Sequence, residues 1–330
     1  MTNLADKIIR LRDRLGTLHR DAGWHLGFGR NRVRQAKGTR ILVYHGLCRE
    51  HPFRFNTLFL TMRSFENQLK LYKEYFNIIS LDDLYQQRIH EDRFSLCLTF
   101  DDGFANNYEY VLPLLEKYQV PATFFITAIR DTGYDILWND VLSVAYRHGP
   151  SKFHFRDEQY VRGKDGKYIS TGGQLLVDRL RGMDFDAKAE MIGLLGSFKK
   201  EANPDYWLQM SIEQIKTLSL NKWATIGSHA YYHNDLAKIP VSSMKRELER
   251  SKQFLENITG KEIKALAFPY GSFSGEVVRE AKAVGFTQLL AAGYPYPGDK
   301  MDQSLKERLI INPFITGVNQ MYANITGSYK

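Results

Sequence analysis

Cysteine is scarce in this chain, which has only Cys48 and Cys97 among 330 residues. Two thiols can build neither a disulfide framework nor a thiolate metal cluster, so both kinds of site are excluded. Cys97 lies inside an apolar run, where we expect a small buried thiol. The cysteines therefore leave the redox compartment open, with a preference for the cytoplasm.

Long apolar segments are missing as well. Six charged side chains interrupt the first 18 residues, so this segment has no apolar stretch of the kind that a secretory signal needs, and no later run is long enough to span a membrane. The chain contains no repeat of fixed period and no low-complexity stretch. From the sequence we expect a cytoplasmic protein, with peripheral association at the inner membrane face as the alternative.

Positive charge is concentrated near the amino terminus. The net charge is +8, and residues 1–40 contain ten Lys or Arg against three Asp, so the rest of the chain is nearly neutral. Apolar residues recur every three or four positions from Leu4 to Leu18, which predicts an amphipathic helix. Such a helix could bind an anionic membrane surface through residues 1–36, or it could pack on the main domain. We favour packing, and we expect no nucleic-acid partner because the body has no aromatic-interleaved basic groove.

Short apolar strands alternate with amphipathic helices along the rest of the chain, which is typical of a parallel α/β sheet or barrel. The pattern predicts one barrel-like domain of seven or eight βα units, residues 39–330, preceded by a basic amphipathic extension, residues 1–38. We expect the first helix of the barrel from about Ser64, whose hydroxyl can cap it. The expected strands are 40–47, 77–80, 94–100, 123–127, 223–226, 263–268, 286–291 and 309–311.

The alternation is interrupted from about residue 134 to residue 210. This stretch contains an amphipathic segment, alternating residues around Gly163–Gly166 and further helical sequence. We therefore predict an insertion in the barrel, made of helices and one hairpin.

Two adjacent carboxylates, Asp101 and Asp102, follow the apolar strand 94–100. Uncompensated charge beside a core is costly, so a cation, hydrogen bonds or water must hold these side chains there. Adjacent side chains of an extended chain point opposite ways, but Gly103 lets the backbone bend. One carboxylate can then bind a metal ion while the other meets the metal-bound water.

A second group of polar residues follows the expected strand 223–226. His229 and His233 are four positions apart, so their rings can turn to one side of a tight loop. With one carboxylate they would form a two-histidine, one-carboxylate site that leaves positions open for substrate. The segment Phe268–Gly271 follows a third strand, and residues at the carboxyl ends of barrel strands share one face. The sequence therefore predicts metal-assisted hydrolysis at this face, with one carboxylate as the base.

These motifs together resemble the polysaccharide deacetylases of carbohydrate esterase family 4, which share the NodB homology domain. The resemblance covers roughly residues 40–315 and depends on Thr99–Gly103, Ser228–His233 and Phe268–Gly271. It implies a distorted barrel and metal-dependent removal of N-acetyl, or sometimes O-acetyl, groups from sugars. Its implied residue roles are Asp101 as catalytic base, Asp102, His229 and His233 as ligands of a divalent metal for which zinc is expected, and Tyr270 as an oxyanion donor through its backbone N–H. The residues around Tyr44-His45 and Trp138 resemble the branch that modifies bacterial exopolysaccharide or lipid-linked glycan.

The sequence departs from the family pattern at three places. Many members have an arginine that pairs with the base at the position of Ala267, and the residue after the first histidine is Ala230 where Ser or Thr is usual. No histidine follows His233, so the usual late general acid is missing. We hypothesise that His45, at the end of the first strand, protonates the leaving group.

Three other functions fit these residues less well than the deacetylase. A glycosidase needs two carboxylates on opposite sides of a glycosidic bond, and two residues adjacent in the sequence are poorly placed for this. A glycosidase would also have no use for the two histidines. An iron oxygenase has no use for the paired Asp residues or the Pro-Tyr-Gly loop. A metal-binding but inactive glycan-binding scaffold is the remaining alternative, motivated by Ala267 and the missing late histidine. We expect Trp138 to be a core aromatic rather than a sugar platform, and the expected substrate is an acetylated sugar, oligosaccharide or lipid-linked glycan.

Overall fold

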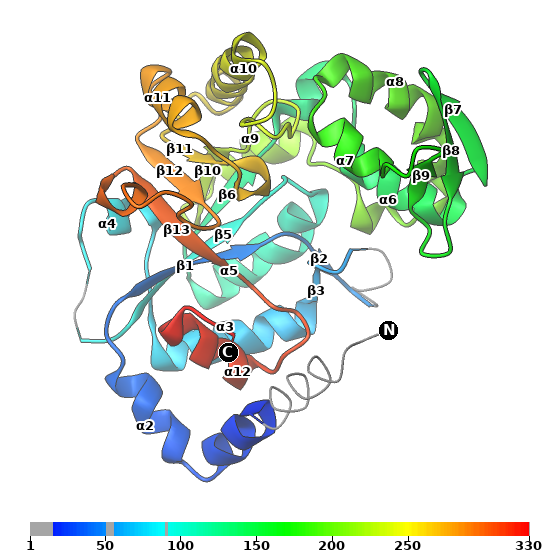
Figure 1. Ribbon diagram of the computed structural model, residues 1–330. Helices are drawn as coiled ribbons and strands as arrows, with labels where there is room; N and C mark the ends of the chain where they lie inside the picture. The colour runs from blue at the N-terminus through cyan, green and yellow to red at the C-terminus, as the bar shows by residue number, and fades with distance from the viewer. Residues whose placement is uncertain (1–15, 51–55, 90–91, 330) are drawn as a thin grey trace.

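Seven parallel strands form a closed barrel at the centre of the computed structural model, which describes residues 16–50, 56–89 and 92–329. The barrel closes because the first of these strands pairs with both β13 and β5, as in Val43 with Ile310 and with Thr99. Helices surround the barrel (Figure 1), so the predicted (β/α) barrel is confirmed. Its strands, in spatial order, are β1 Thr39–Tyr44, β13 Leu305–Ile310, β12 Gln288–Ala291, β11 Ala265–Ala267, β10 Ala224–Ser228, β6 Ala122–Ile126 and β5 Ser95–Phe100.

Alternate residues of each strand face opposite sides of the barrel wall. Leu42 and Leu98 belong to the large apolar cluster that packs against the helices, whereas Ile41 and Cys97 belong to a smaller cluster inside the barrel. Cys97 is 2% exposed, which confirms the predicted buried thiol. The short strand β4 Asn77–Ile78 pairs with the start of β5, and the helix α4 Leu81–Tyr85 adds apolar residues to the interior cluster.

The first helix outside the barrel begins at Met62, close to its predicted position, but its cap differs from the prediction. The side-chain oxygen of Thr61, not that of Ser64, caps the first barrel helix by accepting a hydrogen bond from the Ser64 N–H at 3.0 Å. After β5 the chain forms a π-helical turn, Asn107–Val111, which leads into α5. The outer helices are α3 Met62–Tyr75, α5 Leu112–Tyr118, α9 Ile212–Leu220, α10 Val241–Thr259, α11 Gly275–Ala283 and α12 Gly317–Thr326.

The insertion packs around an apolar cluster of its own and projects to one side of the barrel (Figure 1). The expected hairpin is present, with the Gly163–Gly166 turn between its strands, and a third strand widens it to a small antiparallel sheet. The elements of the insertion are α6 Trp138–His148, β7 Lys152–Phe155, β8 Glu158–Arg162, β9 Tyr168–Ser170, α7 Leu176–Arg181 and α8 Phe185–Leu195.

The amino-terminal extension is described from residue 16, so most of the predicted helix between Leu4 and Leu18 lies outside the described residues. Residues 16–25 are helical and α2 Phe28–Gln35 follows. Trp24 is buried and its ring lies 4.9 Å from that of Tyr75, whereas Leu26 and Phe28 are 73% and 80% exposed. The described part of the extension therefore has one packed side and one exposed apolar side, and no helix within the described residues is long and apolar enough to cross a membrane.

Candidate metal centre

The acid pair lies in a sharp turn at the end of β5. The Asp101 N–H still donates to the Tyr44 carbonyl at 2.9 Å, but Asp102 and Gly103 have positive φ angles of 74° and 80°. A Cβ at Gly103 would lie 3.3 Å from the backbone of Ile126, so this position needs glycine for space as well as for conformation. The turn sends the two carboxylates to different partners.

Asp102 faces both histidines of the predicted site. Its Oδ1 atom lies 3.3 Å from Nε2 of His229 and 3.2 Å from Nε2 of His233. All three side chains are at most 8% exposed. Ala230 and His233 have left-handed backbone, with φ near 60°, which turns both rings to the same side of the loop. The structure thus brings together the three residues predicted as metal ligands.

The Nδ1 atom of each histidine ring has a partner that orients the ring, so that Nε2 faces Asp102. His229 Nδ1 lies 2.8 Å from the Ala267 carbonyl, and His233 Nδ1 lies 3.1 Å from the Tyr270 hydroxyl. With a proton on Nε2, each ring donates a hydrogen bond to Asp102. A bound cation would instead take the Nε2 lone pairs of rings protonated at Nδ1, the usual arrangement of histidine ligands.

The donor set fits a divalent cation. The three ligand atoms lie within 4.8 Å of one another and are buried. Burial alone would raise the pKa of Asp102, but its hydrogen bonds with His229 and His233 outweigh burial and hold that pKa well below its usual value. The carboxylate is therefore in the anionic form that a cation requires, and one carboxylate with two imidazoles is a set that suits zinc.

Asp101 is paired with an arginine that the sequence analysis missed. Arg308 of β13 donates to both carboxylate oxygens, each at 2.7 Å, and also to the Thr99 hydroxyl at 3.2 Å. Burial raises the pKa of Asp101, but the charge of Arg308 outweighs it, so that pKa lies below its usual value. Ala267 suggested that the predicted base has no arginine partner. This expectation is wrong, because Arg308 pairs with Asp101. Arg308 was missed because the sequence pattern predicts the last strand at 309–311. The strand begins at Leu305, which includes Arg308 and turns its side chain to the inside of the barrel.

Tyr270 lies against the second histidine. Its backbone is left-handed, with φ 60°, and its ring centroid lies 4.7 Å from that of His233. A Cβ at Gly271 would come within 2.3 Å of the Ala292 side chain, which explains the glycine that follows. The hydroxyl contact with His233 adds a role that the backbone N–H prediction did not include.

His45 follows β1 directly and is half-buried. Its charge contributes to lowering the pKa values of both Asp101 and Asp102, so it lies at the same end of the barrel as the acid pair. Within the described residues its ring has no hydrogen-bond or ion-pair partner, which leaves it able to contact a substrate.

Two side chains of α6 extend the site. Trp138 is 1% exposed, and its indole N–H donates to the His233 carbonyl at 3.2 Å, so it is a core residue as expected and not an open sugar platform. Asp140 was not anticipated: burial, together with the nearby charge of Asp102, raises its pKa well above the usual value. Its Oδ2 atom has no hydrogen-bond partner among the described residues.

Comparison with known proteins gives a family match across the barrel. The sequence profile described as polysaccharide deacetylase matches residues 89–149 and 199–289, on either side of a gap that falls within the insertion. The two matched segments contain five of the six predicted site residues, all but His45. No curated protein sequence matches this chain.

Solved structures share the fold at low sequence identity. The deacetylase PplD of Streptococcus pyogenes, in complex with acetate, is 15% identical with a TM-score of 0.53, over 87% of this chain and 97% of that one. IcaB from Ammonifex degensii is 18% identical with a TM-score of 0.54, over 88% and 98% of the two chains. BC0361, a polysaccharide deacetylase from Bacillus cereus, is 19% identical with a TM-score of 0.54, over 87% and 68%. At these identities the likeness establishes the barrel fold.

Proposed function

Because the chain belongs to the polysaccharide deacetylase family and is a carbohydrate deacetylase, we propose that it is a metal-dependent hydrolase that removes N-acetyl groups, with O-acetyl groups as the second choice, from a sugar in a glycan or glycan precursor. One observation carries this proposal. Asp102, His229 and His233 converge within 4.8 Å beside Asp101, a buried carboxylate that Arg308 keeps ionised.

Each residue of the site has a place in the hydrolysis. A zinc ion held by Asp102, His229 and His233 would act as a Lewis acid, polarising the acetyl carbonyl and making a water molecule more acidic. Asp101 takes the proton of the attacking water, and Arg308 holds its carboxylate in position. The backbone N–H of Tyr270 donates to the oxygen that becomes negative after attack. His45 then gives a proton to the sugar nitrogen as the C–N bond breaks, so that acetate and a free amine leave.

The neighbours with the same fold support an acetylated glycan as the substrate. PplD is described as a deacetylase in complex with acetate, and BC0361 as a polysaccharide deacetylase. The alternative of an inactive glycan-binding scaffold had two reasons, Ala267 and the missing late histidine. The first no longer applies, because Asp101 has Arg308 as its partner.

The test of this function combines metal analysis with product release. Purified full-length protein is expected to contain close to one zinc per chain and to release acetate from N-acetylated oligosaccharides. Dialysis against a chelator should abolish acetate release, and added zinc should restore it. Bound metal without acetate release from any acetylated glycan would instead support the scaffold.

We further propose that the enzyme is cytoplasmic and binds the membrane surface peripherally, where a lipid-linked glycan would be its substrate. Leu26 and Phe28 are exposed on a segment that also carries Arg30 and Arg32, a composition that suits an anionic surface. The full chain should float with anionic liposomes and not with neutral ones, and Leu26→Asp/Phe28→Asp should remain in solution. Equal flotation of the variant, or no flotation of the full chain, would refute this part.

A further inference from the structure

The insertion reaches the segment that carries both histidines from three of its helices. We call residues 229–235 the histidine loop. From α6, the Trp138 indole donates to the His233 carbonyl at 3.2 Å. From α7, Arg181 lies 3.5 Å from Asp235. From α8, the ring of Phe185 stacks on that of Tyr232 with centroids 3.6 Å apart. If the insertion served only to border the substrate, it would not need three separate contacts with the histidine loop.

The innermost attachment is a buried lysine. Lys188 of α8 is 0% exposed, and its ammonium group donates to the Asn234 side-chain oxygen. It also lies 4.9 Å above the ring of Trp138. Asn234 directly follows the second histidine. Lys188 therefore contacts the residue next to His233, and it also contacts Trp138, whose indole donates to the His233 carbonyl.

The contact continues through Asn234 into the barrel. The Asn234 side-chain nitrogen donates to Glu247 of α10 at 2.6 Å. The other oxygen of Glu247 accepts hydrogen bonds from the Tyr231 and Tyr232 N–H groups, both at 2.9 Å. One relay, Lys188–Asn234–Glu247, therefore joins the insertion, the histidine loop and an outer helix of the barrel.

The relay allows only one orientation of the Asn234 side chain. Its oxygen must face the ammonium group and its nitrogen must face the carboxylate, because the reverse would leave two buried charges unsatisfied. Burial lowers the pKa of Lys188 to about 8 and raises that of Glu247 to about 7, because it disfavours the charged form of each group. Asn234 is thus fixed at both of its polar atoms.

The histidine loop needs such support because its own backbone is unfavourable. Ala230 and His233 have φ angles of 61° and 55°, a conformation that non-glycine residues adopt only at a cost in free energy. Backbone of this kind persists only where surrounding contacts hold it. The contacts of the histidine loop with the insertion and with Glu247 supply that constraint.

We infer that the insertion is part of the metal centre: Lys188, Asn234 and Glu247 are positioning residues that fix the histidine loop and thereby aim the Nε2 atom of His233. This inference rests on the proposed metal site. It concerns how the ligands are held, and it predicts that metal affinity depends on a residue of the insertion that contacts neither substrate nor metal.

The test measures zinc affinity of full-length variants by competition with a chromophoric chelator. Lys188→Met keeps most of the side-chain volume and removes the charge, and it should weaken zinc binding about 10- to 100-fold, the usual effect of losing a group that orients a ligand. We expect kcat to fall with it at saturating zinc while KM stays close to wild type. Lys199→Met is the matched control, because Lys199 is also a lysine of the insertion that pairs with a carboxylate, Asp135, at 2.5 Å and lies over a tryptophan, yet is not among the residues that contact the histidine loop.

The outcomes separate this inference from the proposed function. If wild-type protein binds no zinc, the metal-dependent function fails, whatever the variants do. If wild type binds zinc and Lys188→Met binds it equally well with unchanged kcat, the relay has no positioning role and the inference is overturned. Should Lys188→Met not fold, Lys188→Met/Glu247→Gln removes both buried charges together, and wild-type zinc affinity in that variant would overturn the inference as well.

Discussion

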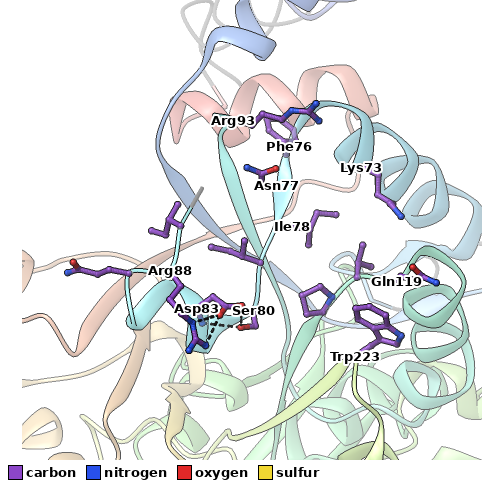
Figure 2. Close-up of a pocket in the computed structure, with 15 residues that line it drawn as sticks. Lys73, Phe76, Asn77, Ile78, Ser80, Asp83, Arg88, Arg93, Gln119 and Trp223 are labelled. Atoms are coloured by element: carbon purple, nitrogen blue, oxygen red, sulfur yellow. Dashed lines mark hydrogen bonds and ion pairs between the residues drawn. The ribbon is translucent and has the colours of Figure 1, made fainter. Parts of the chain in front are cut away.

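The two ends of the barrel show opposite ways of using charged side chains. At the carboxyl ends of the strands, Asp101 and Arg308 form a pair whose side chains are 5% and 3% exposed. At the other end a cavity of about 850 Å³ opens among residues that precede β4, β6 and β10, including Phe76, Pro121 and Trp223 (Figure 2). The charged pair lining that cavity, Arg88 with Asp83, is 61% and 34% exposed, although its atoms are also 2.7 Å apart.

The difference shows that volume alone does not identify a functional site. The ion pair in the large cavity, Arg88 with Asp83, is already screened by solvent, and such a pair contributes little to stability. At the carboxyl end Asp101 and Asp102 are buried, and charged side chains from several strands converge there on one point. Because Asp101 and Arg308 are buried, removing either one would leave the other as an uncompensated charge.

The largest effect is expected from Asp101, the proposed catalytic base. Asp101→Asn keeps the shape of the side chain but cannot accept the proton of water, so kcat should fall about 10²- to 10⁴-fold. Zinc content, measured by elemental analysis, should remain near wild type because Asp102 and the histidines are unchanged. A loss of less than tenfold with full zinc content would show that Asp101 is not the base.

A comparison of two arginines tests the contrast in stability directly. Arg308→Met leaves Asp101 buried without its partner and should lower the free energy of unfolding by about 3–5 kcal/mol. Arg88→Met at the opposite end should lower it by about 0–1 kcal/mol. Urea unfolding followed by circular dichroism measures both, and equal losses would break the contrast between the two ends.

The role of His45 can be examined with substrates that differ in their leaving group. His45→Ala should reduce acetate release from an N-acetylated sugar about 10²-fold, because an amine leaves only after protonation. Hydrolysis of an activated acetyl ester, whose leaving group needs no proton, should change little. Wild-type rates on both substrates would eliminate His45 as the acid.

Glu247 makes the stability of the fold depend on pH. Burial raises the pKa of Glu247 to about 7, so the folded state holds a proton here over a range in which the unfolded chain has lost it. The resulting stability is present at low pH and is lost as the pH rises through about 7. Glu247→Gln should remove this slope between pH 5 and 8, an effect on the order of 1 kcal/mol per pKa unit.

Asp83 supplies the control for that measurement. The hydrogen bond from Ser80 lowers the pKa of Asp83, so any stability linked to it is lost only as the pH falls below its ordinary value. Asp83→Asn should therefore leave the slope between pH 5 and 8 unchanged. Identical slopes for wild type and Glu247→Gln would contradict the prediction for Glu247.

Features encoded by neighbouring residues could be predicted from the sequence, and features that join distant strands could not. The run before Asp101 is mostly apolar, with only Ser95 and Thr99 polar, and β5 is buried throughout, so both the strand and the acid pair are recognisable from the sequence. His229 and His233 share a loop, so their convergence was foreseeable too. Arg308 lies 207 positions from Asp101, and the barrel alone brings them together. Lys188 likewise gave no sign in the sequence, because only folding of the insertion buries it beside Asn234.

The pairing of Asp101 with Arg308 affects how related sequences are interpreted. In a closed sheet several strands offer an inward position from which a guanidinium can reach the same carboxylate, so this partner need not keep its place along the chain. A search that requires arginine next to the Pro-Tyr-Gly loop would count Ala267 as a lost function and would classify such a chain as an inactive relative. Counting partners in space instead would keep chains of this kind among the enzymes.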